Sequence, residues 1–414
     1  YEKLVDRLLA APAYGQHWAQ HWLDLARFAE TDGFEHDKVR PNAWRYRDWV
    51  IDAFNRDLPY DQFVKYQIAG DLHDNNQALA TGFFAVGPTY TSDGGDPESK
   101  AQAEAETLAD RVDTFSRAFL ALTAACARCH DHKFDPITAA DYYAIAGIFR
   151  NSKPRDIPVA SQAERDVFNN VQSAIKAQEK IINEFLDRTA RELKVNRKEV
   201  EAKMSDISRR DLQALREQLD RIRKALPPKP ASAHGLGESG SGDMHIAIRG
   251  DLRKKGPVAP RKFLEIVAGP QRPHFTDGSG RRQLAEAVAD PENPLTARVM
   301  VNRIWMHHFG KGIVASINEF GLRATDPSHP ELLDYLAWYF TGNNWSMKAL
   351  HKHILMSNTY QQTSQDNPRY SVMDPENINY YKMDRRRLDL EPFRDGLIQV
   401  SGVLDLTMAG RPVR

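Results

Sequence analysis

The stretch RVDTFSRAFLALTAACARC, residues 111–129, indicates the fold class, because its long run of apolar residues has the spacing of a helix. Apolar residues three and four positions apart are typical of a helix with one buried face. Comparable patterns precede it at residues 16–30, 42–57 and 60–72. Segments that alternate as strands do are few. The sequence therefore predicts a mainly α protein.

A chain of 414 residues is long for a single core, so we expect two helical domains, residues 1–153 and 231–414. Between them, residues 154–230 predict a protruding antiparallel coiled-coil hairpin with a linker. Its apolar residues step by three and four along two charged segments: Phe168, Val171, Ile175, Ile182 and Phe185, then Leu212, Leu215, Leu219, Ile222 and Leu226, with Gln178 breaking the first series. Contact with a partner and a solvated spacer both stay open as roles for this hairpin.

After the hairpin, the composition changes. Residues 227–243, PPKPASAHGLGESGSGD, are rich in Pro, Gly and Ser and indicate a linker or mobile loop. Residues 244–251 predict a short strand, and helices resume from about residue 259.

The overall composition excludes several classes of partner. With 56 basic and 56 acidic residues, no net charge attracts the chain to nucleic acid or to an anionic membrane. No run approaches the roughly 18 apolar residues of a transmembrane helix. The chain begins in helical register at Tyr1 without an initiator Met, so we expect a trimmed or processed piece.

Both cysteines lie in CARCHDHKF, residues 126–134. A redox pair of the thioredoxin type follows a strand, whereas Cys126 ends a predicted helix. A structural zinc site draws its ligands from two separated knuckles, and the sequence has no second pair of cysteines. A plain disulfide stays open. The sequence C-x-x-C-H is the attachment signature of c-type haem, and we favour that interpretation.

In this interpretation, Cys126 and Cys129 form the thioethers of a covalent haem c and His130 is the proximal iron ligand. Arg128, between the cysteines, is expected to contact the cofactor. His132 emerges on the proximal side, where we expect it to make hydrogen bonds that orient the site.

The sixth ligand of the iron must come from a distant segment. One source is the helix predicted at 296–309, which we expect to end at Gly310 and which carries Met300, Met306, His307 and His308. The helix that carries His17 and His21 is the competing source. A core helix without a ligand, and hence an open iron site, is the third alternative.

Four further polar groups have structural alternatives. His17, His21 and Asp24 have a spacing that can hold a metal, although Trp18 and Trp22 favour histidines packed in a helical core. Asp135 is expected to cap a helix that starts at Pro136. His329 stands near a helix start, where Ser328 is the better cap. The arginines of residues 384–395, Arg385, Arg386 and Arg387, with Glu391 and Asp395, suit either an anionic ligand or a lattice of salt bridges.

Several long stretches resemble the paired domains of unknown function in planctomycete-type cytochrome c proteins, over nearly the whole chain. The stretches that carry the resemblance are HWLDLARFAETDGFEHD (21–37), residues 110–149 with the C-x-x-C-H, NPLTARVMVNRIWMHHFGKGIV (293–314), FGLRATDPSHPELLDYLAWYF (320–340) and DRRRLDLEPFRD (384–395). The resemblance implies a domain with the C-x-x-C-H followed by its usual C-terminal partner domain. It also implies that an N-terminal cytochrome c module is missing here. Finally, it implies redox chemistry in the cell envelope that is linked to the degradation of polysaccharides.

Together these observations predict an extracytoplasmic c-type haem protein, in the periplasm or cell envelope. We expect it to transfer electrons, with another cytochrome as redox partner, or to be a haem-dependent oxidoreductase with a carbohydrate substrate. The alternative is a non-redox binding or assembly protein of the envelope, with a structural disulfide or metal knuckle at the C-x-x-C.

Overall fold

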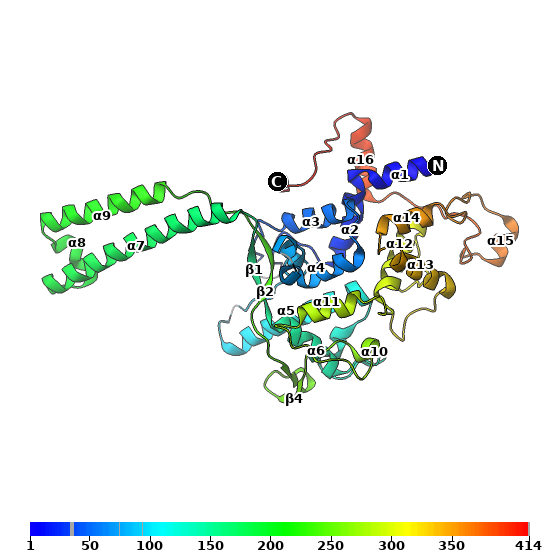
Figure 1. Ribbon diagram of the computed structural model, residues 1–414, viewed down its shortest axis with the longest axis horizontal. Coiled ribbons are helices and arrows are strands. Elements are labelled where there is room, and N and C mark those ends of the chain that lie inside the picture. Colours follow the sequence, from blue (N-terminus) through cyan, green and yellow to red (C-terminus); the bar gives the residue numbers. More distant parts are fainter. Residues whose placement is uncertain (34–36, 74, 93, 413–414) are drawn as a thin grey trace. The chain divides into compact units, whose positions relative to one another are not determined.

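The computed structural model describes residues 1–33, 37–73, 75–92 and 94–412. As the sequence predicted, helices dominate (Figure 1), and the strands in the described residues form two small two-stranded sheets. Up to the first strand, the elements are α1 (Glu2–Ala10), α2 (Pro12–Leu25), α3 (Trp44–Asn55), α4 (Tyr60–His73), the 3-10 helix η1 (Asn75–Phe84), α5 (Pro97–Phe115), the π-helix η2 (Ser116–Leu120), the 3-10 helix η3 (Ala124–Arg128) and α6 (Ala139–Arg150).

The remaining elements begin with β1 (Ser152–Pro158), α7 (Gln162–Leu193), η4 (Arg197–Glu199), α8 (Val200–Lys203) and α9 (Asp206–Lys224). They continue with β2 (Ser232–Glu238), β3 (Met244–Ala247), η5 (Ile248–Gly250), β4 (Lys255–Ala259) and α10 (Glu265–Ala268). The last helices are α11 (Arg281–Ala289), α12 (Thr296–Phe309), α13 (Pro330–Gly342), α14 (Met347–Leu355), α15 (Pro368–Met373) and α16 (Leu390–Val400).

The chain divides into two compact units. Unit 1 contains residues 1–157 and 233–414, and unit 2 contains residues 158–232. In unit 1 the large apolar core takes side chains from both ends of the chain, among them Trp22, Phe119, Ile304 and Phe340. The predicted division at 153/154 and 230/231 into two helical domains stays a prediction.

In unit 2, α7 and α9 lie side by side (Figure 1). Their contact buries Ile182 and Leu186 of α7 against Leu212 and Leu219 of α9. Gln178, which breaks the apolar series, is also buried, and its side-chain amide donates to the main-chain oxygen of Leu215 at 3.0 Å. The two helices that the apolar spacing predicted are confirmed, whereas their coiled-coil geometry stays a prediction.

The stretch 111–129 is not one helix, contrary to the sequence prediction. The α-helix ends at Phe115, a π-helix follows, and Ala121 takes a left-handed conformation with φ 51°. The N–H of Leu122 donates to Ser116 O at 3.1 Å, because the carbonyl of Ala118 instead accepts from the guanidinium of Arg303. An arginine of α12 thus takes the acceptor that a continuous helix would need.

Residues 227–243 are not simply a loop, which corrects a second prediction. They contain β2, which pairs with β1. Leu236 is fully buried, and its N–H donates to the Thr81 hydroxyl at 2.9 Å. The strand predicted at 244–251 is present over Met244–Ala247 as β3, which pairs antiparallel with β4, whereas Ile248–Gly250 form the 3-10 helix η5.

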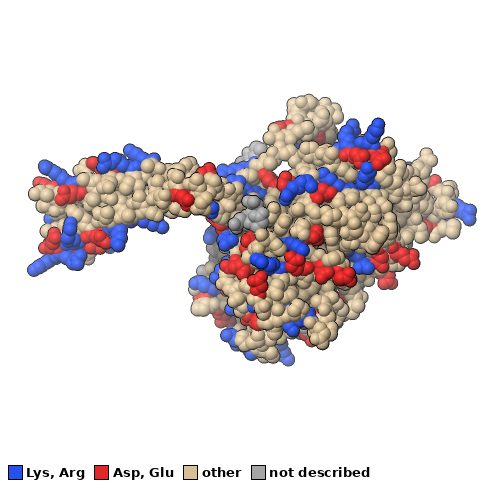
Figure 2. Space-filling model, in the orientation of Figure 1, with Lys and Arg blue, Asp and Glu red and all other residues tan. Residues whose placement is uncertain are grey.

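Acidic and basic side chains are interspersed over the face drawn in Figure 2, as expected for equal numbers of each. A helix long and apolar enough to cross a membrane does not occur in the part of the chain that the structure describes.

Candidate functional site

The C-x-x-C-H segment lies on a turn between η2 and α6. Cys126 belongs to the 3-10 helix η3, and Cys129 follows directly after it. Both cysteines are exposed, and their thiols are free. Free, exposed thiols are available for covalent modification, whereas a structural disulfide would have joined them.

His130 is exposed, and its Nδ1 lies 2.7 Å from the main-chain oxygen of Asp131. A carbonyl oxygen only accepts, so Nδ1 carries the proton and Nε2 of the neutral ring keeps its lone pair. Asp131 is fixed in turn, because its Oδ1 accepts from the N–H of Ala139, the first residue of α6, at 2.8 Å. The imidazole is therefore oriented with a free metal-binding nitrogen, which is the usual arrangement of a ligating histidine.

His132 joins the two ends of the turn. Its Nδ1 accepts from the N–H of Asp135 at 2.8 Å, and its Nε2 lies 3.0 Å from the hydroxyl of Thr123. Since Nδ1 accepts, Nε2 carries the proton and donates to Thr123. His132 thus holds the turn in shape, and its role toward a cofactor stays a prediction.

Arg128 points to a carboxylate of the protein. Its guanidinium lies 3.0 Å from Glu106 of α5, and its main-chain oxygen accepts from the hydroxyl of Tyr143 at 3.1 Å. The predicted contact of Arg128 with the cofactor is not tested by this pairing and stays a prediction.

Asp135 does not cap the following helix, which corrects the sequence prediction. That helix begins at Ala139, and Thr138 caps it in a capping box with Asp141. Asp135 Oδ1 instead accepts from the N–H of Leu322 at 2.7 Å. Close by, the N–H of Phe320 donates to Ala121 O at 2.8 Å. The turn is therefore held from outside by a segment almost 200 positions away.

Two residues that support the turn, Asp131 and Tyr143, were not predicted from the sequence. An aspartate shortly before a helix was the available signal for Asp131, since such residues often bond the free N–H groups of a helix start. No local signal pointed to Tyr143, because its partner is a main-chain carbonyl of the turn.

The distal-ligand candidates lie together in a cluster of aromatic rings that we call the histidine cluster. His21 of α2 and His307 of α12 stack with ring centroids 3.6 Å apart. His308 Nε2 lies 2.9 Å from Nδ1 of His351 of α14, and Trp18 packs on His351 at 4.1 Å between centroids. Burial lowers the pKa of His307 to about 3 and that of His308 to about 4. These imidazoles are accordingly neutral near pH 7.

The histidine cluster lines two cavities of about 260 Å³ each. No residue of 126–132 lines either cavity. His21 and His307 stack on each other, whereas His130 lines neither of these two cavities. Among the described residues, no three His, Cys, Asp or Glu side chains are grouped to hold a metal, and this includes His17, His21 and Asp24.

The arginine-rich segment reaches the same helix. Arg386 donates to the main-chain oxygens of His307 and His308 at 2.9 and 3.0 Å and so caps the end of α12. As predicted, α12 ends at Gly310, whose N–H donates to Met306 O at 2.7 Å. His329 precedes α13 without a side-chain cap, so the cap expected from Ser328 is absent.

Residues 1–154 match the model of a family described as PSCyt2, protein of unknown function (DUF1549). Residues 280–414 match the model of PSD1, protein of unknown function (DUF1553). The chain carries the paired DUF1549 and DUF1553 domains. The pairing that the resemblance implied is thus confirmed. The search of curated proteins found no match. The search of solved structures found none either.

The DUF1549 domain contains the C-x-x-C-H turn and α2, and the DUF1553 domain contains α12 and α14. Phe320 and Leu322, which hold the turn, therefore belong to the DUF1553 domain. The histidine cluster also takes its members from both domains.

Proposed function

We propose that this chain is an extracytoplasmic c-type haem protein that transfers electrons or uses the haem in an oxidoreductase reaction. The observation that carries the proposal is the set of donors on one turn: two free, exposed thiols followed by an imidazole whose Nε2 is free and whose Nδ1 is held by a carbonyl. These residues fit the group that the C-x-x-C-H implies. When bound, such a haem supplies one-electron redox chemistry.

In this proposal, Cys126, Cys129 and His130 each have a defined role. The thiols of Cys126 and Cys129 would hold the haem through two thioether bonds, each formed by addition of S–H across a vinyl group without net oxidation. His130 would bind the iron through Nε2, and the hydrogen bond from Nδ1 to Asp131 fixes its tautomer and ring orientation.

Covalent haem attachment takes place on the outer side of the cytoplasmic membrane, so the proposal places the protein in the periplasm or cell envelope. Its redox partner would be another cytochrome. Of the alternatives at the C-x-x-C, the structural disulfide is not supported by the two free thiols. For the metal knuckle, the described part of the chain contains no group of three metal-binding side chains.

The proposal is tested by expressing the protein in a host with the c-haem maturation machinery. We expect a haem stain that survives denaturing electrophoresis, and a haem adduct on the peptide that contains Cys126 and Cys129. The double variant Cys126→Ser/Cys129→Ser should lose both signals. The same gene in a host without that machinery is the control. Two unmodified thiols in the wild type from the competent host would contradict the proposal.

A second measurement separates a carrier from an enzyme. Under anaerobic conditions, reduction of the haem by an added oligosaccharide supports a carbohydrate oxidoreductase. Electron exchange with a reduced cytochrome, without reduction by oligosaccharides, supports a carrier.

A further inference from the structure

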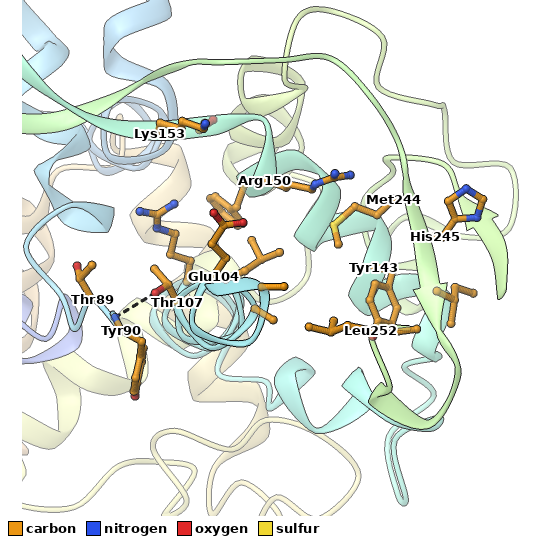
Figure 3. Close-up of a pocket in the computed structure, with 18 of the residues that line it drawn as sticks. Thr89, Tyr90, Glu104, Thr107, Tyr143, Arg150, Lys153, Met244, His245 and Leu252 are labelled. Atoms are coloured by element: carbon orange, nitrogen blue, oxygen red, sulfur yellow. Dashed lines mark hydrogen bonds between the residues drawn. The ribbon is translucent and has the colours of Figure 1, made fainter. Parts of the chain in front are cut away.

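A cavity of about 810 Å³ lies among α5, α6, β1 and the hairpin of β3 and β4, and all its lining residues belong to unit 1 (Figure 3). Its volume is in the range of pockets that bind small organic molecules. None of Cys126, Cys129 and His130 lines it. A ligand of this cavity would therefore be separate from the proposed haem.

Much of the cavity lining is apolar. Leu108 of α5, Phe149 of α6, Met244 and Ile246 of β3, and Leu252 all contribute to it. Phe149 is buried by the protein itself, whereas the other four are only half-buried. A ligand with an apolar body would remove their remaining apolar surface from water, which is favourable.

Three exposed cations also line the cavity, namely Arg150, Lys153 and Lys255, of which the first two are labelled in Figure 3. In the part of the chain that the structure describes, none of the three forms an ion pair with a carboxylate. Arg111 lines the cavity as well, but Asp110 is already its electrostatic partner. Three cations are therefore available to a ligand.

Carboxylates that could neutralise these cations are few. Glu104 is the one carboxylate among the described lining residues (Figure 3). The whole chain has equal numbers of acidic and basic residues, so the excess of cations is a local feature of the cavity. An anionic group on the ligand would form charge-assisted hydrogen bonds with the guanidinium and ammonium groups.

A buried hydroxyl at the same cavity has no acceptor. Ser152 of β1 lines the cavity beside Lys153 and is 2% exposed, and its Oγ has no hydrogen-bond partner among the described residues. A buried polar group without a hydrogen bond costs free energy. Because a carboxylate only accepts and an ammonium only donates, an anionic head group can accept from both the hydroxyl and the cations.

We propose that this cavity binds a small amphipathic anion, such as a long-chain carboxylate. Its apolar body lies against α5 and β3, and its head group lies among Ser152, Lys153 and Lys255. The inference goes beyond the proposed function, because the site uses no residue of the C-x-x-C-H turn. It also assigns a role to β3, which lies between the ranges matched by the two family models.

The head group is tested with three ligands that share one alkyl chain: decanoate, decanol and decyltrimethylammonium. Isothermal titration calorimetry of the full chain, below the micelle-forming concentration of each ligand, should give the tightest binding for decanoate. Decanol should bind roughly tenfold more weakly, since it gains nothing from the cations, and the cationic ligand should bind no better than decanol. Equal affinities for decanoate and decanol would overturn the anionic head group, and absence of decanoate binding would overturn the site.

The role of the cations is tested by removing the same charge from inside and outside the cavity lining. Lys153→Gln/Lys255→Gln should weaken decanoate binding by roughly fivefold and leave decanol binding unchanged. Arg155→Gln/Lys254→Gln is the matched control, because both residues are exposed and close in sequence but do not line the cavity. It should keep the wild-type affinity. Equal losses in the two double variants would overturn the role of the cavity cations.

The location is tested by filling the cavity. Ala105 of α5 lines it and is half-buried, so Ala105→Trp should abolish binding of decanoate and of decanol. Ala103→Trp is the control, since Ala103 is half-buried on the same helix and does not line the cavity. Circular dichroism shows whether each variant is folded, and the charge variants decide the question if a tryptophan variant is not. Decanoate binding retained by folded Ala105→Trp would overturn the assignment to this cavity.

Discussion

At the scale of single residues, a buried ion pair joins α4 of the DUF1549 domain to α11 of the DUF1553 domain. Arg281 of α11 is fully buried, and its Nη1 and Nη2 lie 2.7 and 2.8 Å from the two carboxylate oxygens of Asp71 of α4. Replacing Arg281 by Met leaves Asp71 buried without its partner. We expect a loss of about 3–5 kcal/mol in the free energy of unfolding, as for other broken buried pairs, measured by denaturant titration.

Arg282 provides the matched control for that substitution. It is the next residue, but its side chain is half exposed and its nearest carboxylate, Asp277, is 3.7 Å away. Arg282→Met should change the free energy of unfolding by less than about 1 kcal/mol. Similar losses in the two variants would show that the buried pair adds no more than a surface one.

Gly250 shows how closely the cysteine turn is packed. Its φ of 76° is left-handed, and a Cβ there would meet Cys129 Sγ at 2.7 Å. Gly250→Ala should therefore lower the free energy of unfolding by roughly 1–2 kcal/mol, the usual cost of a left-handed alanine. Gly242→Ala, with no atom within 4 Å of the added Cβ and no positive φ, is the control. Equal stability of these two variants would contradict the strain expected for an alanine at position 250.

At the scale of elements, the histidine cluster couples the packing of α2, α12 and α14 to pH. Burial, with Arg386 and His17 nearby, lowers the pKa of His308 to about 4. The unfolded chain binds a proton near pH 6.5 while the folded protein does not, so stability is full above pH 6.5 and falls as the pH drops toward 4. At 1.36 kcal/mol per pH unit, His308 alone accounts for roughly 3 kcal/mol across that range.

This coupling is measured as the change of the thermal unfolding midpoint between pH 7 and pH 4.5. His308→Gln should flatten the fall, because it removes one titrating group and keeps a polar side chain beside His351. Tyr360→Phe, which alters a ring that packs on His308 and keeps every histidine, should retain the wild-type slope. An unchanged slope in His308→Gln would contradict the assigned effect.

At the scale of the whole molecule, the two compact units predict separable folding. The ends of the helical hairpin lie together, since the N–H of Val159 donates to Ala231 O at 2.9 Å. Replacing residues 162–228 by a short Gly-Ser linker should leave unit 1 folded, with an unfolding midpoint close to that of the full chain. Circular dichroism should lose the helical signal of α7 and α9.

The control for the deletion keeps the chain length. Leu212→Asp places a charge in the contact between α7 and α9. It should destabilise unit 2 and leave the unfolding of unit 1 unchanged. A deletion variant that does not fold, or that loses covalent haem in the competent host, would show that unit 1 depends on the hairpin.

Features that depend on neighbours within a few turns could be predicted from the amino-acid sequence alone. Apolar spacing predicted α3, α4, α7 and α9, and Gly310 marked the end of α12 because glycine accepts the left-handed conformation there. The three-residue spacing of the cysteines, with His130 directly after them, singled out the turn. These signals are local, so they survive in a single sequence.

The contacts between residues far apart in the sequence became visible only in the folded chain. The guanidinium of Arg303 donates to the Ala118 carbonyl, within the helix predicted at 111–129. The N–H of Leu322 donates to Asp135, which was expected to cap a helix. The pairing of β2 with β1 turns a Gly-rich stretch into a strand. Arg111 and His245, 134 positions apart, line one cavity. Hydrogen bonds and buried charges are satisfied by whichever group packing brings within reach, and the spacing of residues along the chain does not record that choice.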